Sequence, residues 1–407
     1  MHRVIVIGGG AAGLLAAYSA SSLGKKVILL EKNEKLGKKI YITGKGRCNL
    51  ANNVPTNEFF NFVVSNPKFL FSAINSFSPK ETIEFFEKNG LQIKIERGNR
   101  VFPSSDKASD VTKTLEKLLI KNNVEIKLNT EVKSLLVQDN IVKGVVDINE
   151  NIYQCDSLIV CTGGLSYSST GSTGDGYKFA KNVGHSIVEP KSALVGLELK
   201  GNEFLEMQGL SLKNVSLTAK MGAKTIYSDF GEMLFTHFGI SGPIVLSCSS
   251  VINRKDLNNI DLFINLKPAL DNQTLENRLL REFKENNVKE ISTVMRSLLP
   301  KALIQTVLRQ AKVKQTKNCS EITVLERQSI VNTLKNLRFS VKKLRPIEEA
   351  IVTSGGISVK EINPKTFESK LVNGLFFAGE VIDVDAFTGG FNLQIAFSTG
   401  YVAGINA

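Results

Sequence analysis

A strand, a glycine-rich turn and a helix follow one another near the start of the sequence, in the order that binds a dinucleotide phosphate. Residues 4–7 are all β-branched, a pattern typical of a strand buried on both faces of a parallel sheet. Residues 8–13 read Gly-Gly-Gly-Ala-Ala-Gly, which fits the spacing G-x-G-x-x-G. A helix rich in Ala and Leu is expected over residues 14–23, and a second strand over residues 27–30. This order predicts a βαβ unit that binds a dinucleotide.

The glycines of this turn meet separate physical requirements. Gly8 permits the tight turn, Gly10 lets the backbone approach a pyrophosphate, and Gly13 lets the helix pack closely on the strand. The start of the helix, at Ala11 and Ala12, offers free N–H groups and a partial positive charge to the phosphates. We therefore expect these five residues to line the cofactor.

An acidic residue stands at the end of the second strand. Glu31 lies 18 residues after Gly13, where its carboxylate can accept hydrogen bonds from ribose hydroxyls. An acid at this position disfavours a ribose that carries a 2′-phosphate, so NADP is not expected in this site. NAD and FAD both stay open, because the glycines suit either pyrophosphate.

Three later segments favour FAD. Residues 37–49 form a basic loop that contains glycines, at a place where an NAD dehydrogenase normally continues into its next βα unit. A buried strand over residues 157–161 runs into Thr162-Gly163-Gly164, and another over residues 375–378 runs into Gly379-Glu380. A strand that ends in glycine and an acid can bind the ribityl hydroxyls of a flavin.

A second helix that opens on glycine is expected towards the end of the sequence. Gly389-Gly390-Phe391-Asn392 precede a helical run from Leu393 towards Ala403. The positive end of such a helix can face the N1–C2=O edge of a flavin, where it would stabilise the negative charge of the reduced ring. This segment therefore predicts the flavin end of the cofactor site.

Five ordered motifs make the chain resemble the FAD-dependent oxidoreductases grouped with aminoacetone oxidase and a bile-acid-inducible flavoprotein. The motifs are the N-terminal glycines, residues 43–49 (Thr-Gly-Lys-Gly-Arg-Cys-Asn), residues 162–164 with 170–176, residues 234–243 and residues 379–392. The resemblance covers nearly the whole length. It implies FAD, a flavin domain split by an insertion, and an activity that often remains unassigned within the family. Lys45 departs from the pattern, because many relatives have glycine there.

The predicted cofactor residues come from these segments. By the resemblance, the strand that carries Val132 is expected to lend its backbone to the adenine. Arg47 could orient an anionic substrate or hold a flavin phosphate, and a role in cofactor binding or loop structure is favoured over catalysis. The complete set of candidates for FAD binding is Gly8, Gly10, Ala11, Ala12, Gly13, Glu31, Lys32, Lys38, Lys39, Gly46, Arg47, Cys48, Asn49, Val132, Thr162, Gly163, Gly164, Gly379, Glu380, Gly390, Phe391, Asn392 and Leu393.

The expected fold class is α/β, with a Rossmann-like FAD-binding domain split by an inserted β-barrel-like domain and a small helical domain. A chain of 407 residues is too long for one compact core. The FAD-binding domain is predicted at residues 1–190 and 345–407, with a boundary at Pro190. The β-rich domain is predicted at residues 191–270, and the basic helical domain at residues 271–344.

The positive charge is concentrated in one region. The net charge of the chain is +12, and residues 267–345 hold 17 basic and 7 acidic side chains, a net of +10. Solvated helix faces are the favoured interpretation. The alternative is a surface for acidic partners, such as nucleic acid, a phosphorylated substrate or NADPH. Aromatic residues are sparse in this region, so nucleic acid is the less favoured partner.

Few side chains suggest catalysis, because a flavin supplies the difficult chemistry itself. His237, one of three histidines, could transfer protons near neutral pH, although a loop histidine satisfied by backbone groups explains it equally well. Asp175 is expected to cap a helix. The five cysteines form no C-x-x-C pair, so neither a dithiol mechanism nor a metal site is expected.

These observations predict an FAD-dependent oxidoreductase that exchanges hydride between a small-molecule substrate and flavin N5. Electrons would pass to oxygen or come from NAD(P)H, which would dock transiently because a second dinucleotide fingerprint is missing. An RNA-acting flavoprotein that uses the basic helical region and a non-catalytic flavin-binding redox sensor stay open. No apolar run approaches the roughly 18 residues of a membrane span, and the cysteine pattern favours a reducing cytoplasm. The oligomeric state has no sequence signal.

Overall fold

The computed structural model describes residues 2–407, which form two compact units. Unit 1 contains residues 2–193 and Ile347–Ala407, and unit 2 contains Leu194–Pro346. A Rossmann-like unit is thus interrupted by one insertion that holds a closed barrel and helices, which confirms the predicted fold class. Among the described residues, no helix is both long and apolar enough to cross a bilayer.

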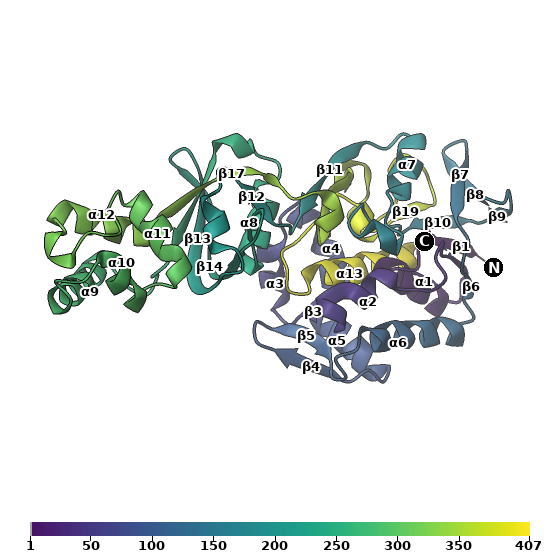
Figure 1. Ribbon diagram of the computed structural model, residues 1–407. Helices are drawn as coiled ribbons and strands as arrows, with labels where there is room; N and C mark the ends of the chain where they lie inside the picture. Colours follow the sequence, from purple (N-terminus) through teal and green to yellow (C-terminus); the bar gives the residue numbers. More distant parts are fainter. Residues whose placement is uncertain (1) are drawn as a thin grey trace. The chain divides into compact units, whose positions relative to one another are not determined.

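A parallel sheet of five strands forms the centre of unit 1 (Figure 1). Its order is β19-β10-β1-β2-β6. The strands are β1 (Arg3–Ile7), β2 (Lys26–Leu30), β6 (Glu125–Lys127), β10 (Ser157–Val160) and β19 (Leu375–Phe377). Val4, Ile5 and Val6 are fully buried, because layers cover both faces of the sheet. The carboxyl ends of the strands meet at one edge, where ligands bind in open parallel sheets.

Two helices from distant parts of the sequence pack against each other on this sheet, namely α1 (Ala11–Ser22) and α13 (Phe391–Asn406) (Figure 1). A Cβ atom at Gly400 would lie 2.2 Å from the carbonyl oxygen of Ala12, and one at Gly404 would lie 2.3 Å from that of Ala16. The helices therefore run in the same direction, with backbones so close that only glycine fits at these two contacts. The start of α13 precedes the Gly400 contact by nine residues, and the start of α1 precedes the Ala12 contact by one, so the two helix starts are offset by about 12 Å along the helix direction.

Smaller sheets and helices surround this central layer. The small sheets contain β3 (Ala51–Asn52), β5 (Arg100–Pro103) and β4 (Ile93–Glu96), then β7 (Val132–Gln138), β8 (Ile141–Asp147) and β9 (Ile152–Gln154). The other α-helices of unit 1 are α2 (Lys38–Ile42), α3 (Thr56–Phe59), α4 (Phe71–Ser76), α5 (Pro79–Lys88), α6 (Ala108–Lys121) and α7 (Asp175–Asn182). A hairpin turn at Asp139-Asn140 joins β7 to β8, and both turn residues have positive φ.

The expected boundary at Pro190 differs from the structure. Pro190 lies inside β11 (Ile187–Ala193), which pairs antiparallel with β18 (Val352–Ile357). The pairing register shifts between Val188 and Lys191, and a proline is tolerated at such an irregularity because no ladder N–H is needed there. The chain leaves unit 1 only after Ala193.

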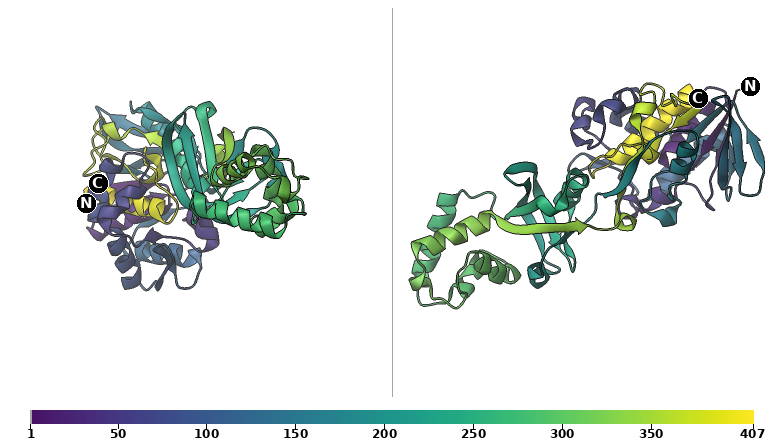
Figure 2. Two further views of the ribbon diagram at one scale, coloured as in Figure 1. Left: turned by 90° about the vertical axis from the view of Figure 1, so that its left-hand side faces the viewer. Right: turned by 90° about the horizontal axis from the view of Figure 1, so that it is seen from above.

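Unit 2 is built on a closed barrel of six strands in the order β12-β15-β14-β13-β16-β17. These strands are β12 (Leu197–Leu199), β13 (Ser211–Met221), β14 (Lys224–Phe235), β15 (Gly239–Ser241), β16 (Ile260–Asn265) and β17 (Leu337–Leu344). Its helices are α8 (Pro243–Ile252), α9 (Asn272–Glu285), α10 (Ile291–Val294), α11 (Lys301–Gln310) and α12 (Val324–Lys335). Figure 2 shows α9 to α12 gathered at one end of the barrel.

The barrel and these helices share one hydrophobic core. Buried side chains of β16, such as Leu262 and Ile264, belong to the same cluster as Leu279 and Leu334 of the helices. β17 lies inside residues 271–344, the range expected to be helical, yet it completes the barrel. Its apolar residues Leu337, Phe339 and Val341 alternate with polar ones, and that period of two is a strand pattern. The division of unit 2 into a β-rich and a helical domain stays a prediction.

Candidate flavin-binding site

The glycine turn between β1 and α1 has the geometry that a diphosphate requires. A Cβ atom at Gly13 would lie 1.8 Å from the carbonyl oxygen of Gly8, so only glycine permits this packing. A Cβ atom at Gly10 would meet no atom within 4 Å. Gly10 is also the N-cap residue of α1, and no side chain caps the helix. The first N–H groups of α1, including those of Ala11 and Ala12, are therefore available to a ligand.

Glu31 connects this turn to the end of β2. Its side chain is buried, and Oε2 accepts a hydrogen bond from the Gly9 N–H at 2.7 Å. Oε1 accepts from the backbone N–H of Asn33 at 2.8 Å and from the Asn33 side-chain amide at 2.6 Å. The carboxylate thus orients the glycine turn, in addition to the predicted role at the ribose.

We expect Glu31→Gln to weaken binding of FAD and of ADP about tenfold each while the protein stays folded. An amide retains one acceptor oxygen but loses the charge that strengthens hydrogen bonds to a ribose, a difference on the order of 1.5 kcal/mol. Titration of the apoprotein, followed by flavin fluorescence and by calorimetry for ADP, measures both affinities. The matched control is Glu34→Gln, since Glu34 is exposed in the same segment. Unchanged affinity for both ligands in Glu31→Gln would remove Glu31 from the site.

The start of β7 and a polar cleft lie next to Glu31. The Glu31 carbonyl accepts from the Thr130 N–H at 2.9 Å, which brings the segment that enters Val132 beside the end of β2. A cleft of about 500 Å³ is lined by Lys32, Asn33, Glu131, Ser168, Ser169, Gly171, Thr173, Asp175 and Lys178. Lys38 contacts Asn33, one of the residues that line the cleft, because its Nζ donates to the Asn33 Oδ1 at 3.2 Å. The structure thus brings together residues predicted for the adenosine end, and their role in binding adenosine stays a prediction.

Lys32 and Asp175 form an ion pair across the cleft. The Lys32 Nζ lies 2.7 Å from the Asp175 Oδ2 and donates to the Thr173 hydroxyl at 2.5 Å. Burial raises the pKa of Asp175, but the contacts with Lys32 and Thr173 lower it by more, so the pKa lies below the ordinary aspartate value.

The expectation that Asp175 caps α7 is wrong, because Gly174 is the N-cap and Asp175 is the first helical residue. The cap has a φ of 80°, a conformation that glycine adopts without strain.

Lys39 and Glu380 form a second ion pair, with their nitrogen and oxygen atoms 2.5 Å apart. Glu380 also accepts from the Ser166 hydroxyl at 2.7 Å and from the Thr353 N–H at 2.8 Å. Burial raises the pKa of Glu380, but the charge of Lys39 and these hydrogen bonds outweigh it, so the pKa lies below the ordinary glutamate value. The acid predicted after β19 therefore stays ionised. The neighbouring Gly379 contacts α1, since a Cβ atom there would lie 2.8 Å from that of Ala12.

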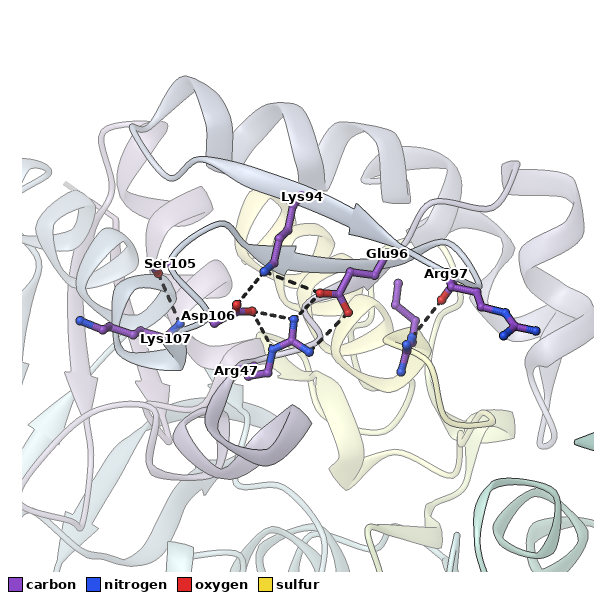
Figure 3. Close-up of polar contacts among 8 residues, drawn as sticks. Arg47, Lys94, Glu96, Arg97, Ser105, Asp106 and Lys107 are labelled. Carbon is purple, nitrogen blue, oxygen red and sulfur yellow. Dashed lines mark hydrogen bonds and ion pairs between the residues drawn. The ribbon is translucent and has the colours of Figure 1, made fainter. Parts of the chain in front are cut away.

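The segment from Thr43 to Asn49 is a strained loop that Arg47 holds in place (Figure 3). The Arg47 Nε donates to Asp106 at 2.6 Å, and the guanidinium also pairs with Glu96. Its carbon lies 4.1 Å from the centre of the Phe102 ring. The hydrogen bonds that Arg47 donates to Glu96 and Asp106 raise the pKa of its guanidinium. Because two carboxylates already compensate its charge, a role in loop structure accounts for Arg47 best.

The same loop contains residues with a left-handed backbone conformation, and two of them, Lys45 and Cys48, are not glycine. Gly46 has a φ of 85°, while Lys45 and Cys48 have φ of 59° and 60°. The family resemblance predicts glycine at position 45, and Lys45 therefore carries a side chain in a backbone conformation that favours glycine. Cys48 is fully buried, and burial raises the pKa of its thiol to about 12. The thiol therefore stays protonated at neutral pH, and Cys48 is suited to packing rather than to nucleophilic chemistry.

Two buried polar atoms fit a bound cofactor. The Thr162 hydroxyl and the Asn49 Oδ1 have no hydrogen-bond partner in the described part of the chain. Buried polar atoms are normally satisfied, so a polar ligand that reaches them removes an energetic cost. Thr162 lies two residues after the end of β10, and a Cβ atom at Gly8 would lie 3.3 Å from the Thr162 Cα. Gly163 has a φ of 73°, and a Cβ atom at Gly164 would clash with the Thr353 hydroxyl at 2.4 Å. The residues present therefore fit FAD.

The start of α13 is a second open helix terminus. Gly390 is its N-cap, with a φ of 103° and no side-chain cap. A Cβ atom at Gly390 would lie 2.2 Å from the Ala51 carbonyl oxygen, so the loop after Asn49 is packed directly on this turn. The Asn392 side chain accepts from the Ala386 N–H at 2.9 Å and donates to its carbonyl at 2.8 Å, which holds the preceding loop. Phe391 is buried and Leu393 is half-buried.

His237 is the one predicted site residue that belongs to unit 2. It lies in the turn between β14 and β15, and its side chain is exposed. Its ring meets the Phe238 ring edge to face, with centres 5.1 Å apart. All predicted FAD residues lie in unit 1. Ser166 and Thr353, which hold Glu380, were missed by the sequence analysis, because neither carries a pattern that points to a partner so distant in the chain.

The fold and the site define a dinucleotide-binding flavoprotein. The HI0933-like protein Rossmann domain family matches residues 2–406, and the chain belongs to this family. It is 31% identical over 409 residues to the 3-dehydro-bile acid delta(4,6)-reductase of Clostridium scindens, with 99% of this chain and 98% of that protein covered. It is 32% identical over 406 residues to the ribosomal RNA dihydrouridine synthase of Haemophilus influenzae, with 99% and 97% covered. The predicted family resemblance is confirmed.

Solved structures share the fold. The 3-ketosteroid-Δ4-(5α)-dehydrogenase from Rhodococcus jostii RHA1 superimposes with a TM-score of 0.54 at 14% identity, over 100% of this chain and 96% of that chain. This likeness shows the shared fold, while the family match and the bile-acid reductase relative identify the chain as an enzyme of the FAD-dependent oxidoreductase class.

Proposed function

We propose that this protein is an FAD-dependent reductase that transfers a hydride to a carbon–carbon double bond conjugated with a carbonyl group. The observation that carries the proposal is the pair of parallel, glycine-opened helix starts, at Gly10 and Gly390, offset by about 12 Å. An extended FAD suits this offset, with its pyrophosphate at α1 and its ring at α13. The positive end of α13 would favour the negative charge of a reduced flavin.

The names of the relatives support the type of reaction. One relative is a delta(4,6)-reductase of a 3-dehydro-bile acid, and another is a dihydrouridine synthase. Both names describe saturation of a double bond next to a carbonyl, since the C5=C6 bond of uracil is conjugated with its C4 carbonyl. In this reaction the β-carbon gains a hydride and the α-carbon gains a proton.

The residues of this chain would have separate roles in that reaction. Bound FAD would supply the hydride from its N5 position. Glu31 and the α1 start would hold the ADP half, and the Lys39–Glu380 pair would orient the ribityl chain. We propose His237 as the proton donor and NAD(P)H, docked transiently, as the electron source. A cytoplasmic location, expected from the cysteine pattern, belongs to the same proposal.

Reoxidation of the reduced holoenzyme tests the reaction type. The yellow protein is reduced under anaerobic conditions with NADH, NADPH or dithionite and then mixed with a 3-oxo-Δ4 steroid. We expect the flavin absorbance to return, and not to return with the matched saturated 3-oxo steroid. Dithionite reduces the flavin without a nicotinamide, so failure of NADH or NADPH to reduce the enzyme can be distinguished from failure of the steroid to accept the hydride. If neither conjugated enones nor uracil-containing RNA restore the absorbance, the protein is a flavin-binding redox sensor and the proposal is wrong.

Uridine in RNA is the second candidate substrate, favoured by the charge of unit 2. Residues 267–345 carry a net charge of +10, and several exposed basic side chains have no ion pair within residues 2–407. These are Arg281, Lys284, Arg296, Lys301, Lys312 and Lys314. Filter binding of ribosomal RNA across a salt titration, followed by mass spectrometry of its uridines, tests this candidate. Salt-insensitive retention, or RNA without added hydrogen atoms, would exclude it.

A further inference from the structure

A buried side-chain amide lies beside the open start of α13. Asn52, the last residue of β3, is 3% exposed. Its Nδ2 donates to the Gly389 carbonyl oxygen at 2.9 Å and to the Gly98 carbonyl oxygen at 3.1 Å. The carbonyl oxygen of the preceding residue, Ala51, would lie 2.2 Å from a Cβ atom at Gly390. The backbone and the side chain of β3 therefore contact the two glycines that precede α13.

These contacts fix the orientation of the Asn52 amide. Both hydrogens of Nδ2 face carbonyl oxygens, and an inverted amide would place Oδ1 against the same two acceptors. Oδ1 is buried, and it has no hydrogen-bond donor among residues 2–407. A buried acceptor without a donor is costly, so a ligand that donates to Oδ1 would be stabilised by this contact.

The start of α13 presents hydrogen-bond donors next to this acceptor. Gly390 is the N-cap, no side chain caps the helix, and the Gln394 N–H donates to the Gly390 carbonyl oxygen at 3.1 Å. The N–H groups of Phe391, Asn392 and Leu393 precede that bond, so they have no acceptor within the helix. A ligand that fits here has an acceptor for these N–H groups and, beside it, a donor for the Asn52 Oδ1.

We infer that the Asn52 Oδ1 accepts a hydrogen bond from N3–H of the flavin ring. The oxidised isoalloxazine ring has a single N–H group, at N3, and this group lies between the C2=O and C4=O acceptors. A ring whose C2=O faces the N–H groups of α13 would therefore present N3–H to an acceptor beside the helix start. The fully reduced ring also has N3–H, so the contact would hold the ring in both redox states. The inference rests on the proposed position of the ring at α13, but not on the proposed reaction.

A flavin that lacks this donor tests the contact. In 3-methyl-FAD a methyl group replaces the hydrogen on N3, while the ADP half is unchanged. The wild-type and Asn52→Ala apoproteins are titrated with FAD and with 3-methyl-FAD. We expect the wild type to bind 3-methyl-FAD at least about tenfold more weakly than FAD, because the methyl group leaves Oδ1 unpaired. Asn52→Ala should bind FAD about tenfold more weakly than the wild type does, and should bind the two flavins with similar affinity.

ADP and an exposed neighbour provide the controls. ADP has no flavin ring, so its affinity should be the same for the wild type and for Asn52→Ala. The matched variant is Asn53→Ala, because Asn53 is exposed and directly follows Asn52. This variant should keep the wild-type preference for FAD over 3-methyl-FAD. Equal binding of the two flavins by the wild type, or an undiminished preference for FAD in Asn52→Ala, would overturn the inference.

A measurement on the wild type alone keeps the test decisive if Asn52→Ala does not fold. FAD labelled with nitrogen-15 at N3 is bound to the apoprotein, and the proton on N3 is followed by NMR. We expect this proton to be shifted downfield from its position in free FAD and to exchange with water much more slowly, since it is buried and hydrogen-bonded. A proton that exchanges as rapidly as in free FAD would contradict the assignment.

These results are separate from those of the enone test. Both measurements concern the binding of oxidised FAD, so the assignment of Asn52 stands even if no enone or uridine reoxidises the reduced protein. Conversely, if the protein reduces enones while Asn52→Ala keeps the full preference for FAD, the proposed reaction stands and the contact with N3–H is wrong.

Discussion

Gly10→Val is expected to give a folded protein that purifies without flavin. A Cβ atom at Gly10 meets no protein atom within 4 Å, so the chain itself has room for a side chain. The β-branched side chain would instead occupy the space in which a pyrophosphate approaches the α1 start. We expect FAD affinity to fall at least about a hundredfold, on the order of 3 kcal/mol. Flavin absorbance per protein, circular dichroism and the melting temperature of the apoprotein measure loading and folding together.

The neighbouring glycine provides the contrast for this prediction. A Cβ atom at Gly13 would lie 1.8 Å from the Gly8 carbonyl oxygen, so Gly13→Ala should destabilise the apoprotein as well as reduce flavin content. A Gly10→Val protein that is yellow and fully loaded would contradict the placement of the pyrophosphate. A Gly10→Val apoprotein as unstable as Gly13→Ala would show that Gly10 is needed for folding and not for the cofactor.

Lys39→Met is expected to lower the free energy of unfolding of the apoprotein by about 3 kcal/mol, because it leaves the Glu380 carboxylate largely buried without its cation. The Ser166 hydroxyl and the Thr353 N–H would remain as its donors. Urea unfolding measures the loss. The matched control is Lys38→Met, whose exposed pairing with Glu34 should be worth less than about 1 kcal/mol.

The effect of Lys39→Met should depend on pH in a definite direction. The pKa of Glu380 is lowered in the folded protein, so its stabilisation is present above the ordinary glutamate value of about 4.3 and is lost as the pH falls through the folded pKa. The difference between wild type and Lys39→Met should therefore be largest at neutral pH and shrink in acid. The double variant with Glu380→Gln should recover part of the lost stability. A constant difference at all pH values would mean that Lys39 stabilises the fold through packing alone.

Much of unit 1 follows from local patterns. The β-branched run at residues 4–7 and the glycine spacing up to Gly13 depend on backbone geometry over a few residues, and the structure has a buried strand, a turn and a helix there. The hairpin at Asp139-Asn140 follows in the same way, because its two residues tolerate positive φ. Pro190, the predicted domain boundary, lies inside β11. A proline is tolerated there because the pairing register is irregular and no ladder N–H is needed.

Partners across the chain required the tertiary structure. Arg47 meets Glu96 and Asp106, and no periodicity links these positions. The glycines at 400 and 404 had no local role, and the approach of α1 explains them.

By itself, the sequence determined the dinucleotide turn, the succession of strands along the chain after this turn, and the family of the chain. These features depend on short-range geometry and on ordered motifs. Only the tertiary structure decided that Glu31 orients the glycine turn and that Lys39 neutralises Glu380. Such pairings depend on how the chain closes in space: Gly9 and Glu31 are 22 positions apart and Lys39 and Glu380 are 341 apart, and neither segment alone signals its partner.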